Sequence, residues 1–210
     1  MVFQFKNIVP EPLLNRDLTQ SDLWAKNTII DGTANVHICA PSGTGKTSLL
    51  SILYGLRFDF SGEWTLDSVW SSDIDWVQVR QNEMAFVFQD LKLLENETAL
   101  SNVVLKNQLT SALSETEIWN AAEQLGVQQL LEKPVGKLSR GERQRIAIIR
   151  SLCMPFKCIL LDEPFSHLDE ENSLKAAALI QQYATKNNAG ILMANLKQDH
   201  YFQYEQTLNL

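Results

Sequence analysis

The sequence predicts an α/β fold with a mainly parallel sheet. Two observations carry this prediction: short apolar runs alternate with amphipathic helical stretches, and a glycine-rich turn directly follows one of the apolar runs. Strands that helices cover on both faces are almost continuously apolar, which is the pattern found here. The 210 residues are enough for one large domain or two small ones with a hydrophobic core.

The first half of the chain is expected to contain mostly strands. Residues 1–9 alternate apolar and polar side chains, as a half-buried strand does, and the polar residues 10–23 include two prolines and are typical of a loop. The other elements expected here are a buried strand at residues 34–40, a helix over 46–56 that stops near Gly55, and strands at 62–70 and 83–89.

From about residue 90 to residue 137 the pattern becomes helical, which indicates an inserted subdomain. Ser114 with Glu117, and Ser139 with Glu142, form capping-box patterns ahead of helical stretches. The remaining expected elements are a buried strand at 157–164, a helix over 169–187 that stops near Gly190, and a buried strand at 190–195.

Composition restricts the possible partners. The net charge of −7 disfavours a broad electrostatic grip on DNA or RNA, so no nucleic-acid partner is expected. The three cysteines form no metal-ligand pattern and are expected to be reduced. The N-terminus lacks the pattern of a signal peptide, and no apolar run approaches the roughly 18 residues of a membrane span. If the protein serves a membrane, another chain must span it.

Residues 40–47, APSGTGKT, match the phosphate-binding pattern GxxxxGK[ST] at every fixed position except the first, Ala40. Small residues let successive backbone N–H groups point at phosphate oxygens, and the following helix adds its positive N-terminal end. Lys46 is expected to reach the terminal phosphates, and the Thr47 hydroxyl to bind Mg²⁺. Ala40 lies at the mouth of the loop, where a lost glycine matters least. The expected ATP-binding residues are Pro41, Ser42, Gly43, Thr44, Gly45, Lys46, Thr47 and Ser48.

A second motif, CILLDEP, occupies residues 158–164. Its apolar residues predict a buried strand that delivers Asp162 and Glu163 to its end. Asp162 is placed to hold Mg²⁺ through water, and Glu163 to polarise an attacking water as a general base. Alone, such an acidic pair would usually be a helix cap. Downstream of a phosphate-binding loop, it is the expected second half of a nucleotide site.

Residues 137–152, KLSRGERQRIAIIRSL, resemble the signature segment of ATP-binding-cassette (ABC) ATPases, whose usual form is Leu-Ser-Gly-Gly-Gln/Glu. Ser139, Gly141 and Glu142 stand in the signature, with Arg140 in place of its first glycine. A serine cap and the backbone N–H groups of a helix N-terminus form an anion site. The resemblance implies that this site closes on the γ-phosphate held by another subunit, so that two chains sandwich two ATP molecules head to tail.

The resemblance covers nearly the whole chain. FVFQD, residues 86–90, resembles the Q-loop, in which Gln89 would sense Mg²⁺ or water and contact the coupling helix of a membrane partner. SHLDE, residues 166–170, resembles the D-loop, in which Asp169 would reach across the dimer. The implied catalytic residues are Lys46, Gln89 and Glu163, and the implied Mg²⁺ ligands are Thr47, Gln89 and Asp162.

The resemblance also implies the domain organisation. One ABC ATPase domain would span residues 1–210, with an N-terminal antiparallel β region. Its RecA-like core with the β subdomain would take residues 1–89 and 138–210, and the helical subdomain about 90–137. The surroundings of VFQ and GERQR are most similar to the subunits of lipoprotein-release, macrolide-efflux and cell-division complexes.

Three departures from the family pattern bear on hydrolysis. Asn195 and Leu196 follow the last core strand, where the family usually has a switch histidine, and His200 comes four residues later. No aromatic residue near the end of the first strand offers to stack on adenine, although Trp24 is a distant candidate. Arg140 places a bulky cation in the signature.

The favoured function is an ATP-hydrolysing subunit, bound to the cytoplasmic face of a membrane by a separately encoded integral partner. It would act with MgATP as a homodimer or as a heterodimer with another cassette chain. The alternative is an ATP-binding switch with weak or no hydrolysis, either alone or paired with an intact cassette chain. A soluble cassette ATPase of DNA repair or translation is disfavoured, because those usually carry a long coiled-coil insertion or two cassettes in one chain.

Overall fold

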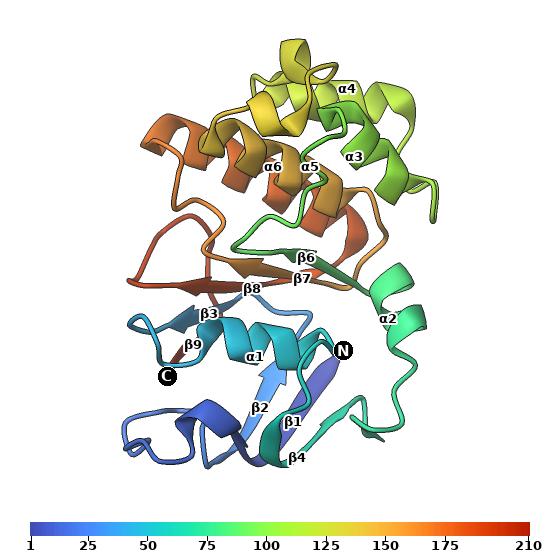
Figure 1. The fold of residues 1–210 in the computed structure, drawn as a ribbon. Helices are drawn as coiled ribbons and strands as arrows, with labels where there is room; N and C mark the ends of the chain where they lie inside the picture. Colours follow the sequence, from blue (N-terminus) through green and yellow to red (C-terminus); the bar gives the residue numbers. More distant parts are fainter.

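The computed structural model describes residues 1–210 and confirms an α/β fold with a parallel central sheet (Figure 1). Five strands form this sheet in the order β6-β7-β8-β3-β9, and every neighbouring pair is parallel. Their bounds are β3 Val36–Cys39, β6 Met84–Val87, β7 Cys158–Asp162, β8 Gly190–Asn195 and β9 Gln206–Asn209. Because the strands run the same way, their C-terminal ends meet at one edge of the sheet.

The first third of the chain builds a second, antiparallel sheet in the order β2-β1-β4-β5. Its strands are β1 Val2–Pro10, β2 Asn27–Asp31, β4 Phe60–Leu66 and β5 Val69–Trp70. Phe3 and Phe5 of β1 lie on the same face and pack against Trp64 of β4, with ring centroids 6.2 and 5.9 Å apart. One face of this sheet is therefore an aromatic core, since alternate strand residues point the same way.

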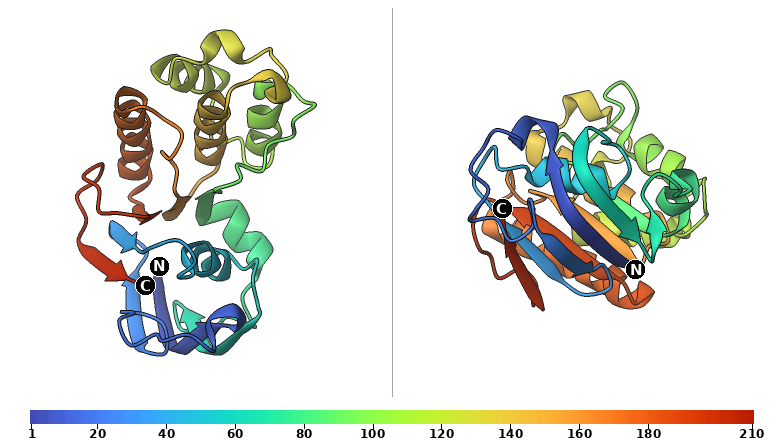
Figure 2. Two further views of the ribbon diagram at one scale, coloured as in Figure 1. Left: turned by 60° about the vertical axis from the view of Figure 1, so that its left-hand side comes forward. Right: turned by 90° about the horizontal axis from the view of Figure 1, so that it is seen from below.

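The helices divide between the two faces of the parallel sheet. Their bounds are α1 Lys46–Leu53, α2 Trp76–Asn82, α3 Ala99–Asn107, α4 Glu115–Gln124, α5 Arg140–Leu152 and α6 Glu170–Asn187, with short 3-10 turns at Glu11–Leu13, Gln128–Leu130 and Val135–Lys137. Helix α1 packs between the parallel and antiparallel sheets, whereas α5 and α6 cover the opposite face, with α3 and α4 beyond them (Figures 1 and 2). No helix combines the length and the apolar composition that crossing a bilayer requires.

Two hydrophobic cores follow from this layering. On β7, Ile159 and Leu161 join the core beneath α5 and α6, while Cys158 and Leu160 join the core around α1 and the antiparallel sheet. Every residue of β7 is buried, which explains why its first four residues are all apolar. The rigid strand thus holds its last residue, Asp162, at the C-terminal edge of the sheet.

Several expected elements are wrong in detail. The single strand expected at residues 62–70 is a hairpin, because Asp67 and Ser68 turn the chain with φ of +49° and +69°. The helix expected over 169–187 and the strand expected over 190–195 are confirmed as α6 and β8, but the residue that stops the helix is the left-handed Asn188 and not Gly190. Strands β2 and β9 and helix α2 were not expected, and the strand expected at 83–89 ends at Val87. The region expected to be helical contains α3 and α4, while its status as a separate subdomain stays a prediction.

Candidate nucleotide site

The phosphate-binding loop connects β3 to α1, and its glycines are needed for its shape. Gly43 and Gly45 have φ of +82° and +103°, in the left-handed region that side chains disfavour. A Cβ on Gly45 would also lie 2.9 Å from Leu13 and 3.0 Å from Trp24. Ala40, in contrast, has a negative φ and is buried, so the backbone does not require glycine at this position. The departure of Ala40 from the pattern is thus compatible with the loop.

Trp24 supports the loop from beneath. Its ring is 1% exposed, and its indole N–H donates a hydrogen bond of 2.9 Å to the Thr44 carbonyl. A side chain held in this way has no free face for adenine. The suggestion that Trp24 could stack on the base is therefore wrong, because the ring is already part of the packing below Gly45.

Lys46 begins α1 and is buried despite its charge. Its ammonium donates to the carbonyls of Ala40 (2.8 Å) and Pro41 (3.0 Å), and lies 3.6 Å from a carboxylate oxygen of Glu163. These contacts place the cation at the point where the phosphate loop and the end of β7 meet. This contact is the ion pair between the two motifs.

Thr47, Gln89 and Asp162 converge beside Lys46 from three elements. The Thr47 hydroxyl donates to Asp162 Oδ2 at 2.8 Å and lies 3.4 Å from the Gln89 side-chain oxygen. Asp162 Oδ1 is buried without a hydrogen-bond partner, and burial raises the pKa of this carboxyl to about 6. A set of hard oxygen donors with one orphaned carboxylate oxygen fits Mg²⁺, which favours one or two carboxylates together with substrate phosphates.

Hydrogen bonds to its backbone hold Glu163 in place. It has a φ of +48°, and its N–H donates to the Ala194 carbonyl of β8 at 3.0 Å. Gln144 of α5 donates from its amide to the carbonyl of Glu163 at 3.2 Å, and also to that of Pro164. The carboxylate is therefore aimed at the Lys46 side of the site by contacts from two other elements.

Gln144 was not among the residues expected from the sequence. It is 2% exposed and lies four residues before Ile148, within the buried stripe of α5. A polar residue in an otherwise apolar helical stripe is the signal that would have identified it, because a buried amide needs a specific partner.

A cavity of about 240 Å³ runs along the phosphate loop, and two arginines border it. Arg16 donates to the Gly43 carbonyl at 2.8 Å, and Arg57 donates to the Ser48 hydroxyl at 2.8 Å while pairing with Asp59. Both lie in loops without a recognisable sequence pattern, so neither could be predicted from the sequence. The cavity is lined by Pro12, Leu13, Arg16, Ser42, Gly43, Gly45, Lys46, Thr47, Ser48, Arg57, Gln89 and Glu163.

The signature residues form the N-terminus of α5. Ser139 caps this helix, its hydroxyl accepting from the Glu142 N–H, and the Glu142 carboxylate accepts from the Ser139 N–H. A Cβ on Gly141 would lie 2.9 Å from the His167 carbonyl, so glycine is needed there, whereas Arg140 is exposed. Arg140 borders a second cavity, of about 410 Å³, together with Thr47, Gln89 and Asp162.

The other expected residues lie apart from both cavities. Ser139, Glu142 and Asp169 border neither cavity, and Asp169 caps α6 by accepting from the Asn172 N–H at 2.8 Å. Pro41 and Thr44 belong to the loop but line neither cavity. The Thr44 hydroxyl donates a hydrogen bond to the Pro41 carbonyl. Within one chain, the structure thus brings the phosphate loop, Gln89, Asp162 and Glu163 together, and leaves Ser139 and Asp169 outside.

The segment after β8 is anchored through the Asp199 carboxylate. The Asn195 amide donates to Asp199 at 3.2 Å, and Asp199 also accepts from the Tyr204 hydroxyl at 2.6 Å. His37 of β3 lies 3.3 Å from the same carboxylate, whereas Leu196 and His200 are exposed. His200 therefore borders neither nucleotide-side cavity.

A family model and several known proteins are similar in sequence to this chain. The family model described as ABC transporter matches residues 27–166. The lipoprotein-releasing system ATP-binding protein LolD of Legionella pneumophila (strain Lens) is 36% identical over 164 residues, which are 75% of this chain and 72% of that protein. LolD of Ehrlichia chaffeensis is 34% identical over 166 residues, which are 76% of this chain and 71% of that protein.

Solved structures that are similar to this chain are also ABC cassettes. The dimeric ABC transporter cassette MJ0796 superposes with a TM-score of 0.77 at 25% identity, covering 93% of this chain and 88% of that one. A post-hydrolysis dimer of the same cassette, bound to ADP and Pi, gives a TM-score of 0.75 at 27% identity, covering 95% and 88%.

Proposed function

This chain belongs to the ABC transporter family of ATPases, and we propose that Glu163 is the residue that activates water for ATP hydrolysis in it. The carrying observation is the junction of the two motifs: the Glu163 carboxylate lies 3.6 Å from the Lys46 ammonium, and its backbone is fixed by β8 and Gln144. A carboxylate held beside the lysine that meets the terminal phosphates is placed to take a proton from the attacking water.

The proposed step is the attack of water on the γ-phosphorus of ATP. The bond between water oxygen and phosphorus forms, the bond to the β–γ bridging oxygen breaks, and ADP leaves as the Glu163 carboxylate accepts a proton. Lys46 and the loop N–H groups bind the phosphates, and Arg16 and Arg57 add positive charge along the cavity. When Mg²⁺ is bound, Thr47, Asp162 and Gln89 are the residues that would hold it, and it would neutralise phosphate charge.

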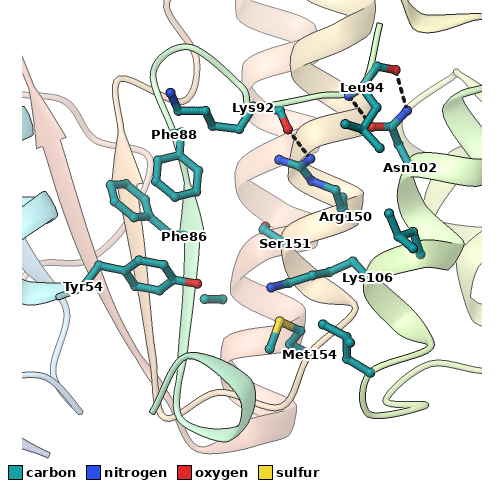
Figure 3. A pocket seen from close by; sticks show the side chains of 13 residues that line it. Tyr54, Phe86, Phe88, Lys92, Leu94, Asn102, Lys106, Arg150, Ser151 and Met154 are labelled. Carbon is teal, nitrogen blue, oxygen red and sulfur yellow. Dashed lines mark hydrogen bonds between the residues drawn. The ribbon is translucent and has the colours of Figure 1, made fainter. Parts of the chain in front are cut away.

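The proposed partner is a separate integral membrane subunit that this chain serves from the cytoplasmic face. A pocket between the parallel sheet and α3 and α5 offers a docking place, and Phe88 on its wall is adjacent to Gln89 (Figure 3). A helix of the membrane subunit in this pocket would therefore contact the segment that carries Gln89. A movement of that helix would then be transmitted to the nucleotide site.

One observation favours a second function, an ATP-binding switch that hydrolyses slowly. The Asn195 amide is engaged by Asp199, and Leu196 carries no polar group, so the usual γ-phosphate contact from this segment is lacking. In that case the chain would bind MgATP and dimerise, and turnover would fall to an intact partner cassette.

Phosphate release by the purified chain with MgATP tests the proposal, beside a Glu163→Gln variant. Loss of a general base lowers rates by about 10²- to 10⁴-fold, so release should fall at least about a hundredfold while ATP affinity, measured by calorimetry, is retained. Wild-type release no faster than that of Glu163→Gln, with ATP bound by both, would contradict hydrolysis through Glu163 and favour the switch.

A further inference from the structure

Arg16 is the cation of the nucleotide cavity that no acid of the chain neutralises. The lining of the cavity along the phosphate loop contains three cations, Arg16, Lys46 and Arg57. Lys46 lies 3.6 Å from a carboxylate oxygen of Glu163, and Arg57 pairs with Asp59 at 2.7 Å. Arg16 makes no ion pair, so its charge borders the cavity without a counterion.

The backbone at Arg16 is tied to the phosphate loop. Its N–H donates to the Leu13 carbonyl at 3.0 Å, and the buried Leu13 packs beneath Gly45. Nη1 of Arg16 donates to the Gly43 carbonyl at 2.8 Å, which is the one hydrogen bond of this side chain. Because a guanidinium carries five N–H donors, four of them stay available for an anion in the cavity.

Asp17, the acid next to Arg16 in the sequence, does not serve as its counterion. The Asp17 carboxylate accepts from the Thr19 N–H at 3.0 Å and from the Thr19 hydroxyl at 2.8 Å. These two hydrogen bonds lower the pKa of Asp17. The acid is thus held in its own turn, and a bound phosphate would supply the counterion that Arg16 lacks.

Ser48 adds a second donor for phosphate on the same cavity. Its hydroxyl accepts from Nη1 of Arg57 at 2.8 Å, and Arg57 is held in turn by both carboxylate oxygens of Asp59. A hydroxyl that accepts in this way keeps its own proton free to donate. Ser48 lies in the first turn of α1, where the helix N–H groups also favour an anion.

The cavity offers little that could distinguish one base from another. None of its lining side chains is aromatic, and its apolar side chains are Pro12 and Leu13, of which Leu13 is only 4% exposed. Its one side-chain amide, Gln89, lies 3.4 Å from the Thr47 hydroxyl, among the residues placed to hold Mg²⁺. Selection of one base needs hydrogen bonds to its edges, whereas a small apolar surface such as Pro12 contacts every base alike.

We propose that Arg16 binds a phosphate of the nucleotide and that the site recognises the triphosphate and not the base, so that nucleoside triphosphates with different bases bind alike. This inference rests on the proposed function, which supplies the nucleoside triphosphate. A hydrogen bond from a guanidinium to a phosphate is comparable in strength to one stack of a base on an aromatic ring. Arg16 would therefore replace the affinity that a stacking residue provides, without selecting adenine.

Calorimetric titration with the β,γ-methylene analogues of ATP, GTP and CTP tests the inference, because their bridging carbon prevents hydrolysis. Inorganic tripolyphosphate is the probe without a base, and each probe is added together with Mg²⁺. The three analogues should bind with dissociation constants within about threefold of one another. An ATP analogue that binds more than about tenfold tighter than the other two would overturn the proposal, because the site would then read the base.

Variants of Arg16 assign the phosphate contact. Arg16→Gln should weaken binding of tripolyphosphate and of all three analogues by the same factor, about tenfold at low salt, whereas Arg16→Lys keeps the charge and should lose less. Arg80→Gln is the matched control, because Arg80 also donates to a glycine carbonyl, that of Gly55 at 3.1 Å, but does not line the cavity. It should bind every probe as the wild type does.

Three results with these variants would contradict the phosphate contact. No loss of affinity in Arg16→Gln would show that the cation is not a ligand. A loss for the analogues but not for tripolyphosphate would place Arg16 against the base or the ribose. Losses of equal size in Arg16→Gln and Arg16→Lys would exclude the positive charge as their cause.

Failure of this inference is separable from failure of the proposed function. The analogues are not hydrolysed, so their binding does not depend on the catalytic role of Glu163. Phosphate release from ATP that requires Glu163, together with a strong preference for the ATP analogue, counts against base-independent recognition alone. Equal binding of the three analogues by a chain whose phosphate release does not depend on Glu163 counts against the proposed catalytic role alone.

Discussion

At the scale of single residues, the nucleotide site depends on side chains that never face the nucleotide. Trp24 fills the space below Gly45 and holds the Thr44 carbonyl, so the loop backbone rests on a buried ring. Gln144 holds the carbonyls of Glu163 and Pro164 in the same way from α5. Both are supports whose hydrogen bonds fix backbone positions, and neither belongs to a phosphate-binding motif.

Trp24→Phe is expected to weaken ATP binding at least about fivefold. The change keeps an aromatic ring but leaves the part-buried Thr44 carbonyl without its donor, which costs about 1–3 kcal/mol when such a group is unsatisfied. Calorimetric titration with MgATP measures the effect. Trp119→Phe is the matched control, because Trp119 lies on α4 with 38% of its side chain exposed. An unchanged dissociation constant would show that the loop keeps its shape without this bond.

Site residues that belong to short sequence motifs could be predicted, whereas residues that reach the site from irregular loops could not. Lys46, Thr47 and Asp162 belong to short sequence motifs with fixed spacing, so they could be located from the sequence, and Thr47 contacts Asp162 as expected for a shared site. Arg16 and Arg57 reach the cavity from irregular loops, where position depends on tertiary packing. Trp24 was considered for adenine only because burial cannot be read from a lone aromatic in a polar stretch.

At the scale of elements, caps were more predictable than strands. Both capping boxes, at Ser114 and Ser139, are present, because each depends on residues only three apart. Strand β9 pairs with β3 from the far end of the chain, and β2 pairs with β1 across a long loop, so nothing local indicates them. The hairpin at Asp67 and Ser68 was missed because neither residue is glycine.

Glu117 at the start of α4 links the capping box to another helix. Hydrogen bonds from Lys186 of α6, and then from Ser114, lower the pKa of Glu117 from 4.5 to about 2. A lowered carboxyl pKa stabilises the fold above the unfolded value, and this contribution is lost as the pH falls towards the folded value. Because both partners are substantially exposed, the contribution stays below about 1 kcal/mol.

Glu117→Gln should therefore reduce the free energy of unfolding at pH 7, and the difference from wild type should shrink as the pH falls from 4.5 towards 2. Glutamine can still cap the helix, so the variant isolates the charge. Urea unfolding at pH 7 and pH 3.5 measures it. Glu115→Gln, in the same helical turn but without an ion pair, is the control. A destabilisation of equal size at both pH values would rule out the ion pair as its cause.

At the scale of the whole molecule, the site is a property of one sheet edge. The phosphate loop follows β3, Asp162 and Glu163 close β7, Asn195 closes β8, and Gln89 lies two residues beyond β6. In a parallel sheet these C-terminal ends are neighbours, so motifs far apart in sequence converge without any special contact. The signature serine, Ser139, starts a helix on the opposite flank and borders neither cavity of its own chain.

Because of that placement, one chain can bind the nucleotide through its phosphate loop, but a contact from Ser139 to a nucleotide needs a second chain. The family dimer would bring Ser139 to the nucleotide of the other subunit, where its hydroxyl and the helix N–H groups meet the γ-phosphate. Ser114 is built in the same way, with a capping box, but it caps α4 and not the signature helix α5. The two serines thus share one structural role and differ in the proposed second role.

Ser139→Ala and Ser114→Ala, each combined with Glu163→Gln to prevent turnover, distinguish these roles. Each should lose about 1 kcal/mol of stability with its cap. Only Ser139→Ala should also weaken MgATP-dependent dimerisation, by more than about tenfold, because a hydrogen bond to a charged phosphate is worth about 1.5–3 kcal/mol and each dimer contains two. Light scattering after gel filtration measures the dimer. Equal dimerisation of the two variants would show that Ser139 serves α5 alone and that phosphate contact across the interface rests on backbone N–H groups.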